Sequence, residues 1–288
     1  MTAMEPSARQ FDVTFPGGRT LQAYDAGPAD ASARTVVWHH GSPNIGPPPV
    51  PLLPTAAELG VRFIGYDRPG YGGSTARPDR SIASAADDVA AILDSLGVDE
   101  CAVVGHSGGG AHALACAALL PERVRAAVTV SGLAPYRAST AEGFDWFAGF
   151  AAAGAASLGA AVRGRTAREA HEERPDEDFG FTAADEEALG GRWSWIMDVV
   201  RPGIASGPAP MVDDDLAAVA DWGFDPADIA VPVLVVHGTA DRVVPSTHGE
   251  WLAGRIPGVE LWLREGDGHI TVLDAGADAL RWLVAAAW

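Results

Sequence analysis

The ten residues from Cys101 to Gly110, CAVVGHSGGG, place the strongest constraint on how this chain can fold. A short apolar run over 101–104 predicts a buried strand, and the Ala- and Leu-rich segment over 111–120 predicts a helix. The turn between them has the pattern G-x-S-x-G, with Ser107 at its centre. A serine on such a turn has a strained backbone that exposes its hydroxyl, and the flanking glycines avoid crowding by a Cβ. We therefore predict that Ser107 is a nucleophile and that the Gly108 N–H faces developing negative charge.

Short apolar segments alternate with helical patterns along most of the chain. Strands are expected at residues 9–15, 20–25, 35–39, 61–66, 101–104, 124–130, 231–237 and 259–263, and helices at 55–59, 82–96, 111–120 and 275–288. Such alternation is typical of a mainly parallel sheet with helices on both faces. We therefore predict an α/β fold in which ligands bind beyond the carboxyl ends of the strands.

The alternation stops between residues 134 and 229. This segment contains aromatic-rich helical patterns, an Ala/Gly stretch and a charged run. We predict that it is a helical cap inserted into a core made of residues 1–133 and 230–288. Most of its aromatic side chains are expected to pack within the cap, while a few line an apolar substrate pocket. The candidates for lining the pocket are Phe144, Trp146, Trp193 and Trp195, together with His40 and His106 from the core.

Two residues later in the chain could activate Ser107. A serine hydroxyl needs a base to take its proton, and the base needs an acid to orient it. Asp241 follows the carboxyl end of the 231–237 strand, and His269 follows the end of the 259–263 strand. The order Ser107, Asp241, His269 is one of the chain orders in which this kind of triad occurs.

Five motifs occur in order, each at the expected carboxyl end of a strand. They are HHGSP at 39–43, YDRPGYGGS at 66–74, GHSGG at 105–109, HGTADRVVP at 237–245 and GDGH at 266–269. With these motifs, nearly the whole chain resembles the serine-nucleophile α/β-hydrolases that carry a helical lid. The resemblance implies Ser107 as nucleophile, His269 as general base and acid, and Asp241 as the orienting acid. It also implies an oxyanion hole made by the backbone N–H groups of Ser42 and Gly108.

The same resemblance disfavours some activities of the fold. Dehalogenases and epoxide hydrolases of this kind carry aspartate at the nucleophile position, where this chain has Ser107. A competing acid, Asp267, lies in the same loop as His269 and would have to fold back to reach it. His112 is expected to be a hydrogen-bonded packing residue, and His237 is expected to support the acid loop.

Neither a metal nor a cofactor is expected. His39 and His40 are adjacent on a strand and point to opposite faces, so with His106 they make poor ligand geometry. The chain has no lysine, which excludes a Ser–Lys dyad, a Schiff-base lysine and a P-loop lysine. The two cysteines, Cys101 and Cys116, are expected to be free buried thiols, as in a reducing cytoplasm.

Net charge and hydropathy limit the expected partners. The net charge of −18 argues against nucleic acid and anionic membrane surfaces. No apolar run is long enough to cross a bilayer, and the first residues lack the pattern of a secretory signal. We therefore expect a cytoplasmic protein with a small-molecule substrate, and the sequence favours neither a monomer nor a homo-oligomer.

The leading hypothesis is a serine hydrolase that cleaves a small-to-medium carboxylic ester through an acyl-enzyme. An aminopeptidase or amidase similar to the proline iminopeptidases stays open, with Glu142 and Asp145 as candidates to bind a substrate ammonium group. The acidic run at 172–178 is expected to be a solvated face. Carbon–carbon bond hydrolysis and cofactor-free perhydrolysis use the same triad and also stay open. A hypothesis of another class is a non-catalytic ligand receptor on this fold.

Overall fold

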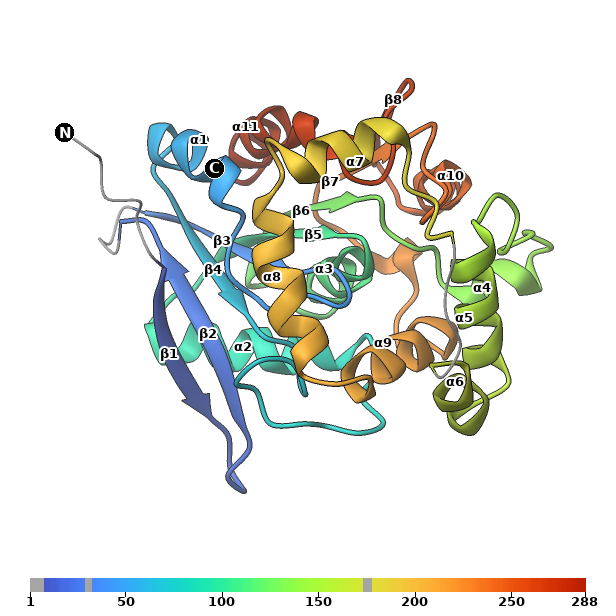
Figure 1. The fold of residues 1–288 in the computed structure, drawn as a ribbon. Coiled ribbons are helices and arrows are strands. Elements are labelled where there is room, and N and C mark those ends of the chain that lie inside the picture. Colours follow the sequence, from blue (N-terminus) through green and yellow to red (C-terminus); the bar gives the residue numbers. More distant parts are fainter. Residues whose placement is uncertain (1–7, 29–32, 173–177) are drawn as a thin grey trace.

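The computed structural model describes residues 8–28, 33–172 and 178–288. In these ranges an eight-stranded sheet forms the centre of the molecule, in the order β1-β2-β4-β3-β5-β6-β7-β8 (Figure 1). The strands are β1 (Arg9–Thr14), β2 (Thr20–Ala26), β3 (Arg34–His39), β4 (Val61–Tyr66), β5 (Cys101–His106), β6 (Val124–Val130), β7 (Val233–Gly238) and β8 (Glu260–Arg264). β2 pairs antiparallel with both β1 and β4, and the other neighbours are parallel. The predicted α/β fold with a mostly parallel sheet is confirmed.

Helices cover both faces of the sheet, and its central strands are therefore buried on both sides. The helices α2 (Ser84–Leu96), α3 (Gly108–Leu119) and α10 (Ser246–Arg255) share one apolar core with the sheet, and α1 (Leu53–Glu58) and α11 (Gly276–Ala287) share the other. Three 3₁₀ helices complete the core, η1 (Val50–Leu52), η2 (Pro226–Asp228) and η3 (Thr271–Ala275). α10 has no counterpart among the predicted elements, because few apolar side chains give it a helical period.

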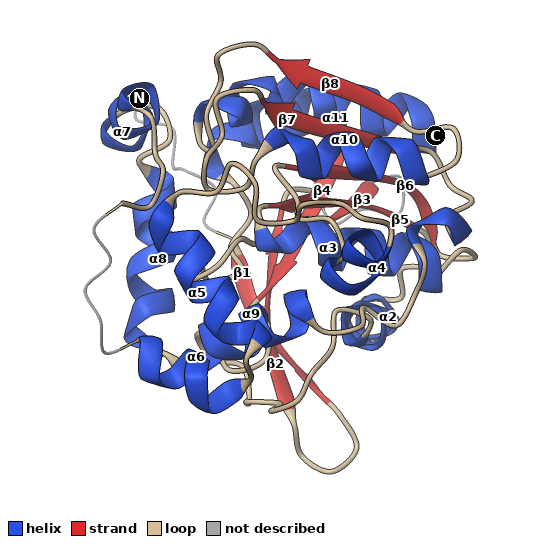
Figure 2. Ribbon diagram, turned by 90° about the vertical axis from the view of Figure 1, so that its right-hand side faces the viewer, coloured by secondary structure: helices blue, strands red, loops and turns tan. Residues whose placement is uncertain are grey.

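The segment between β6 and β7 consists, where described, of helices and loops. Its α-helices are α4 (Tyr136–Ala141), α5 (Ala152–Val162), α6 (Arg165–His171), α7 (Ala183–Gly190), α8 (Trp195–Ala205) and α9 (Ala209–Val219). Figure 2 shows α5, α6, α8 and α9 gathered on one side of the sheet. We call residues 134–229 the helical insertion.

The connection from β5 to α3 is a single residue long. β5 extends to His106, two residues further than expected, and α3 begins at Gly108, three residues earlier than expected. Only Ser107 lies between the strand and the helix. None of the helices in the described ranges has the length and apolarity needed to cross a bilayer.

Candidate active site

The backbone of Ser107 is strained, and the neighbouring residues leave it no room to relax. Its φ is 56° and its ψ is −129°, a backbone conformation that residues other than glycine rarely adopt. A Cβ on Gly105 would lie 2.2 Å from the carbonyl oxygen of Gly109, and one on Gly109 would lie 2.1 Å from that of His39. The Ser107 N–H donates to the Val130 carbonyl at 2.9 Å. The sharp turn therefore depends on both glycines and on the neighbouring strands.

His269 and Asp241 form a buried hydrogen-bonded pair. The Nδ1 of His269 donates to Oδ2 of Asp241 at 2.7 Å. The other oxygen, Oδ1, accepts the backbone N–H groups of Val243 and Val244, both at 2.9 Å. Burial acts to raise the pKa of Asp241, but the charge and hydrogen bond of His269 hold it below its ordinary value. The carboxylate therefore stays ionised and fixes the orientation of the imidazole.

The structure brings Asp241, and not Asp267, to the histidine. Asp267 accepts from Nε of Arg264 at 3.3 Å on the surface. His237 lies against the loop that carries Asp241, and its Nε2 donates to the Val244 carbonyl at 2.8 Å. The structure thus places Asp241 beside His269, and His237 beside the loop of Asp241.

Two further histidines beside Ser107 bond to backbone carbonyls. Nε2 of His106 donates to the carbonyl of His269 at 3.1 Å, and Nδ1 of His112 donates to the carbonyl of Gly108 at 2.9 Å. Burial lowers the pKa of each, to about 3 for His106 and to about 3 for His112. Both are therefore neutral at ordinary pH, and His112 keeps Nε2 as a hydrogen-bond acceptor.

Arg68 holds the loop that carries the second expected oxyanion donor. A Cβ on Gly41 would lie 3.3 Å from the Cβ of Ser107, so this loop packs against the serine. Arg68 donates to the carbonyl of His40, to the carbonyl of Gly41 at 3.1 Å and to Oγ of Ser42 at 2.9 Å. The C=O and N–H of a trans peptide point in opposite directions. Because the Gly41 carbonyl points to Arg68, the Ser42 N–H points away from Arg68.

His40 strengthens the same loop instead of lining a pocket. Its Nε2 accepts the backbone N–H of Arg68 at 3.0 Å, so Nδ1 carries the proton and donates to the Gly41 carbonyl at 2.6 Å. Burial, followed by the charge of Arg68, lowers the pKa of His40 well below its ordinary value. The Gly41 carbonyl thus has two donors.

Asp214 connects the helical insertion to this loop. It lies on α9, and it accepts from Nη2 of Arg68 at 2.7 Å, Nη1 of Arg80 at 2.5 Å, the Tyr71 hydroxyl at 2.9 Å and Oγ of Ser42 at 2.5 Å. Burial acts to raise the pKa of Asp214, but the two arginines hold it well below its ordinary value. Such a cluster keeps its charges only while all partners are in place.

Asp185 connects the insertion to the histidine loop in a similar way. It lies in the first turn of α7, where it forms a capping box with Thr182. Its carboxylate also accepts backbone N–H groups of the core, from His269 at 3.2 Å, Ile270 at 2.9 Å and Thr271 at 2.8 Å. Burial acts to raise the pKa of Asp185, but these hydrogen bonds, with those from Thr182, lower it below its ordinary value.

Two cavities meet at Ser107, and we call them the large lobe and the small lobe. The large lobe has a volume of about 540 Å³ and the small lobe about 210 Å³. His106 and His269 line the large lobe, whereas Gly108 and His112 line the small lobe. The residues that line both lobes are Ser42, Pro43, Ser107, Phe179, Met211 and Val243.

Of the residues expected to line the pocket, His106 lines the large lobe, but the other five line neither lobe. Trp146 is 1% exposed and its Nε1 donates to the Ala134 carbonyl at 2.8 Å. The remaining aromatic residues have packing partners elsewhere: Phe144 contacts His248, Trp193 donates to Asp274, and Trp195 contacts Trp38. The helical pattern expected around Phe144, Trp146 and Phe150 is wrong, because these residues lie in turns and loops between α4 and α5. Aromatic spacing also could not show which side chains face the cavity.

The apolar lining comes from other residues. Phe150 lines the small lobe, Phe181 and Ile196 line the large lobe, and Phe179 lines both. Glu142 and Asp145, the candidates for binding an ammonium group, are exposed and line neither lobe. Glu142 pairs with Arg255 at 3.1 Å. Residues 173–177 of the acidic run lie outside the described part of the chain.

Sequence reasoning missed the three consecutive aspartates of α9. Successive residues of a helix point about 100° apart, so each aspartate meets a different environment. Asp214 bonds the core loop, and Asp215 lines the small lobe and accepts from Arg168 at 2.6 Å. Asp213 bonds Arg165 at 2.6 Å. Three acidic residues inside an otherwise apolar helical segment were a signal that could have singled them out.

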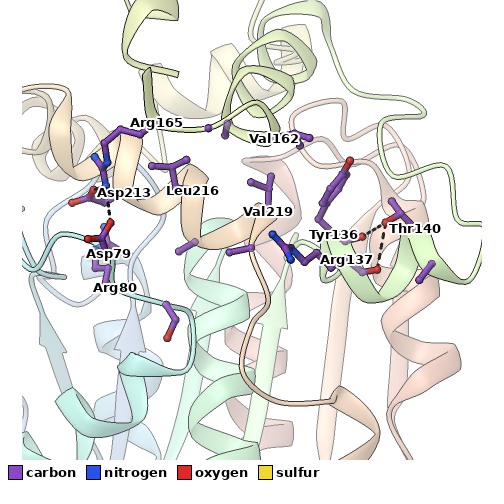
Figure 3. A pocket seen from close by; sticks show the side chains of 16 residues that line it. Asp79, Arg80, Tyr136, Arg137, Thr140, Val162, Arg165, Asp213, Leu216 and Val219 are labelled. Atoms are coloured by element: carbon purple, nitrogen blue, oxygen red, sulfur yellow. Dashed lines mark hydrogen bonds and ion pairs between the residues drawn. The ribbon is translucent and has the colours of Figure 1, made fainter. Parts of the chain in front are cut away.

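Asp213 and Arg165 border a separate hollow of about 890 Å³, shown in Figure 3. It lies between the helical insertion and core residues such as Asp79 and Arg80. It contains neither Ser107 nor the other two residues of the expected triad. Within the described ranges, no three His, Cys, Asp or Glu residues are arranged to hold a metal ion.

A serine on a strand–turn–helix, with a histidine and an aspartate on the loops after later strands, defines a class of enzymes built on a parallel sheet. Residues 34–276 match the sequence model of the alpha/beta hydrolase fold family. The chain belongs to this family, and the expectation of a hydrolase is confirmed at the level of the enzyme class.

Individual relatives cover most of the chain. A bifunctional esterase/perhydrolase of Acinetobacter calcoaceticus is 30% identical over 240 residues, covering 81% of this chain and 83% of the relative. A non-heme chloroperoxidase of Streptomyces lividans is 32% identical over 250 residues, with coverages of 81% and 83%. The crystal structure of a bromoperoxidase from Bacillus anthracis superimposes with a TM-score of 0.69 at 20% identity, covering 97% of this chain and 98% of that chain. The last similarity concerns the fold alone.

Proposed function

We propose that this hydrolase cleaves carboxylic esters through an acyl-enzyme formed on Ser107. The observation that carries the proposal is the shared large lobe. Ser107, on its strained turn, lines this cavity together with His269, whose other nitrogen is bonded to the buried Asp241 at 2.7 Å. A nucleophile, a base and an orienting acid are thus available at one cavity.

In the first half of the proposed reaction, Nε2 of His269 takes the Ser107 proton as Oγ attacks the ester carbonyl. Asp241 stabilises the imidazolium that forms. The imidazolium then gives the proton to the alcohol oxygen, the bond from that oxygen to the acyl carbon breaks, and the acyl group stays on Ser107. In the second half, water attacks the acyl carbon with His269 as base, and the acid is released as Ser107 regains its proton.

The oxyanion of each tetrahedral intermediate would be stabilised by the N–H groups of Ser42 and Gly108. Gly108 is the first residue of α3, where backbone N–H groups lack partners within the helix. The Ser42 donor is pre-oriented because Arg68 and His40 both bond the Gly41 carbonyl. Each such donor is typically worth about 3–4 kcal/mol of transition-state stabilisation.

An ester is favoured over an N-terminal peptide because neither candidate for binding an ammonium group lines a lobe, and Glu172, which lines the large lobe, is already paired with Arg168. Glu142 is paired with Arg255 outside the lobes, and Asp145 lines neither of them. The name of one relative, the bifunctional esterase/perhydrolase, agrees with ester chemistry. We also propose that residues 134–229 act as a cap over a core of 1–133 and 230–288. The two free buried thiols support a cytoplasmic location.

The test is a comparison of substrate classes on the purified chain. A panel of p-nitrophenyl esters is measured beside aminoacyl p-nitroanilides, with Ser107→Ala as the matched control. We expect turnover of esters that the variant loses and at least tenfold lower kcat/KM for the anilides. Preference for the anilides would favour an aminopeptidase. Tight binding of an ester without any turnover would favour a receptor.

A further inference from the structure

The two lobes at Ser107 differ in the chemistry of their walls. Beyond the shared residues, the large lobe has apolar side chains of α8 and the loop before α7, including Phe181, Ile196 and Val200. It also has Glu172, whose carboxylate is paired with Arg168. The small lobe is also mainly apolar, with Leu133, Phe150 and Leu158 in its lining, but one part of its wall carries Asp214, Asp215 and His112. An ester bound across Ser107 would therefore place its two halves in unlike surroundings.

The direction of proton transfer assigns each half of the ester to a lobe. His269 must return its proton to the leaving oxygen, so the alcohol half lies on the side of the histidine. His269 lines the large lobe, whereas Gly108 lines the small lobe. The acyl chain extends from the carbonyl carbon in the other direction, and it therefore enters the small lobe.

Asp215 offers a hydrogen-bond acceptor to that acyl half. Ser157 donates to its Oδ2 at 3.0 Å, and Nε of Arg168 donates to the same oxygen at 2.6 Å. Oδ1 has no hydrogen-bond partner among the described residues. It is also not one of the fully buried side-chain oxygens that lack a partner, so this atom is open to the cavity. The side chain is 18% exposed and lines the small lobe. Oδ1 is thus an accessible acceptor to which no described residue donates.

His112 offers a second acceptor in the same lobe. Its Nδ1 donates to the Gly108 carbonyl, which leaves the unprotonated Nε2 of the neutral ring. Among the described residues, the fully buried side-chain nitrogens that lack a hydrogen-bond partner do not include this Nε2, so it is not sealed from the cavity. Among the described residues this wall has two acceptors, and the guanidinium groups of Arg68, Arg80 and Arg168 are all paired. It therefore calls for a hydrogen-bond donor on the acyl group.

The charges at this wall favour a neutral donor over an ammonium group. Arg68 and Arg80 bond Asp214, and Arg168 bonds both Asp215 and the Glu172 of the large lobe. Three guanidinium groups therefore face three carboxylates. With the charges balanced, an ammonium group gains little attraction to offset the loss of its hydration, whereas a hydroxyl loses less on burial.

We propose that the acyl group of the substrate is short and carries a hydroxyl, which donates to Asp215 or His112 in the small lobe. A bulky apolar alcohol occupies the large lobe. The small lobe, at about 210 Å³, has room for about seven groups the size of water. This inference rests on the proposed ester hydrolysis and specifies its substrate class.

The experiment compares p-nitrophenyl esters that share one leaving group: butanoate, 3-hydroxybutanoate, 3-aminobutanoate and octanoate. Rates without protein are subtracted. We expect kcat/KM for 3-hydroxybutanoate to exceed that for butanoate by ~10- to 100-fold, the range typical of a hydrogen bond to a charged group. Octanoate and 3-aminobutanoate are expected to be poorer than 3-hydroxybutanoate. Between phenyl and 2-naphthyl esters of one acid, the naphthyl ester is expected to have the lower KM.

Variants test whether the preference comes from the small lobe. The readout is the ratio of kcat/KM for 3-hydroxybutanoate to that for butanoate, which does not depend on the folded fraction. Asp215→Asn and His112→Leu should each reduce this ratio towards one. Asp213→Asn is the matched control, because the neighbouring Asp213 borders the hollow of Figure 3 instead, and it should keep the native ratio.

Other outcomes would overturn the inference, and they are distinguishable from failure of the proposed function. A native enzyme that prefers butanoate, octanoate or 3-aminobutanoate refutes the hydroxylated acyl group while ester hydrolysis stands. An unchanged ratio in both Asp215→Asn and His112→Leu removes the small lobe from recognition. If the folded chain cleaves none of these esters, the proposed function fails together with this inference.

Discussion

The carboxylate of Asp185 accepts the backbone N–H of His269 at 3.2 Å, so the helical insertion directly holds the loop of the proposed catalytic base. The same carboxylate accepts Thr271 N–H at 2.8 Å and Thr271 Oγ1 at 3.0 Å. A Cβ on Gly268 would lie 2.0 Å from Asp185 Oδ2, which shows how closely the two segments pack. The insertion therefore contributes to the geometry of the site as well as to its walls.

Replacing Asp185 should impair both folding and catalysis. Asp185→Asn gives up one acceptor oxygen and leaves buried N–H groups without partners, so we expect a loss of about 2–4 kcal/mol in the free energy of unfolding. We also expect kcat to fall more than KM rises, because the histidine is misplaced while the lobes remain. Urea unfolding and steady-state kinetics measure the two effects. Glu187→Gln, an exposed change on the same helix, is the control, and equal behaviour of the two variants would contradict this role.

The sequence predicted those parts of the site that follow directly from a strand end. Ser107, Asp241 and His269 each follow an apolar strand within a few residues, and parallel strands bring such loops to one edge. Asp185 and Asp214 bond residues that are 84 and 172 positions away in the chain. Those contacts depend on how the insertion packs on the core, which no local pattern encodes. The same limit explains why Trp193 and Trp195, expected at the pocket, pack elsewhere.

Arg68 should be required for the orientation of the oxyanion loop. Arg68→Lys keeps the charge but cannot bond two carbonyls, Ser42 Oγ and Asp214 at once. We expect kcat to fall by roughly 10- to 100-fold, the scale of weakening one oxyanion donor. KM should change less than threefold. A variant that raises KM and leaves kcat at the native value would show that Arg68 acts on substrate binding instead.

The assignment of the acid is tested by two parallel variants. Asp241→Asn should lower kcat by about 10⁴-fold, because the amide favours the wrong tautomer of His269, while the fold is kept. Asp267→Asn should change kcat less than about twofold, since its carboxylate bonds Arg264 on the surface. Circular dichroism checks folding in both. The reverse pattern would mean that the acid is Asp267.

Stability should fall in acid because several buried carboxylates are stabilised in their ionised form. The pKa values of Asp185, Asp214 and Asp241 are lowered in the folded chain, so in acid these three groups bind more protons in the unfolded chain than in the folded chain. Their contribution is complete above the ordinary aspartate pKa of about 3.9 and is lost as the pH falls through the lowered values. Unfolding midpoints measured from pH 7 to pH 3 should therefore decrease, and less steeply for Asp185→Asn. A flat profile for the native chain would contradict this account.

The most direct measurement of the central claim is the mass of the chain after reaction with a fluorophosphonate, followed by peptide mapping. Such reagents phosphonylate a serine only where a base and an oxyanion hole activate it. We predict the addition of one phosphonyl group per chain, on Ser107, and no addition to Ser107→Ala or after acid unfolding. Folded native protein that stays unmodified, or that is modified at another serine, would contradict the account.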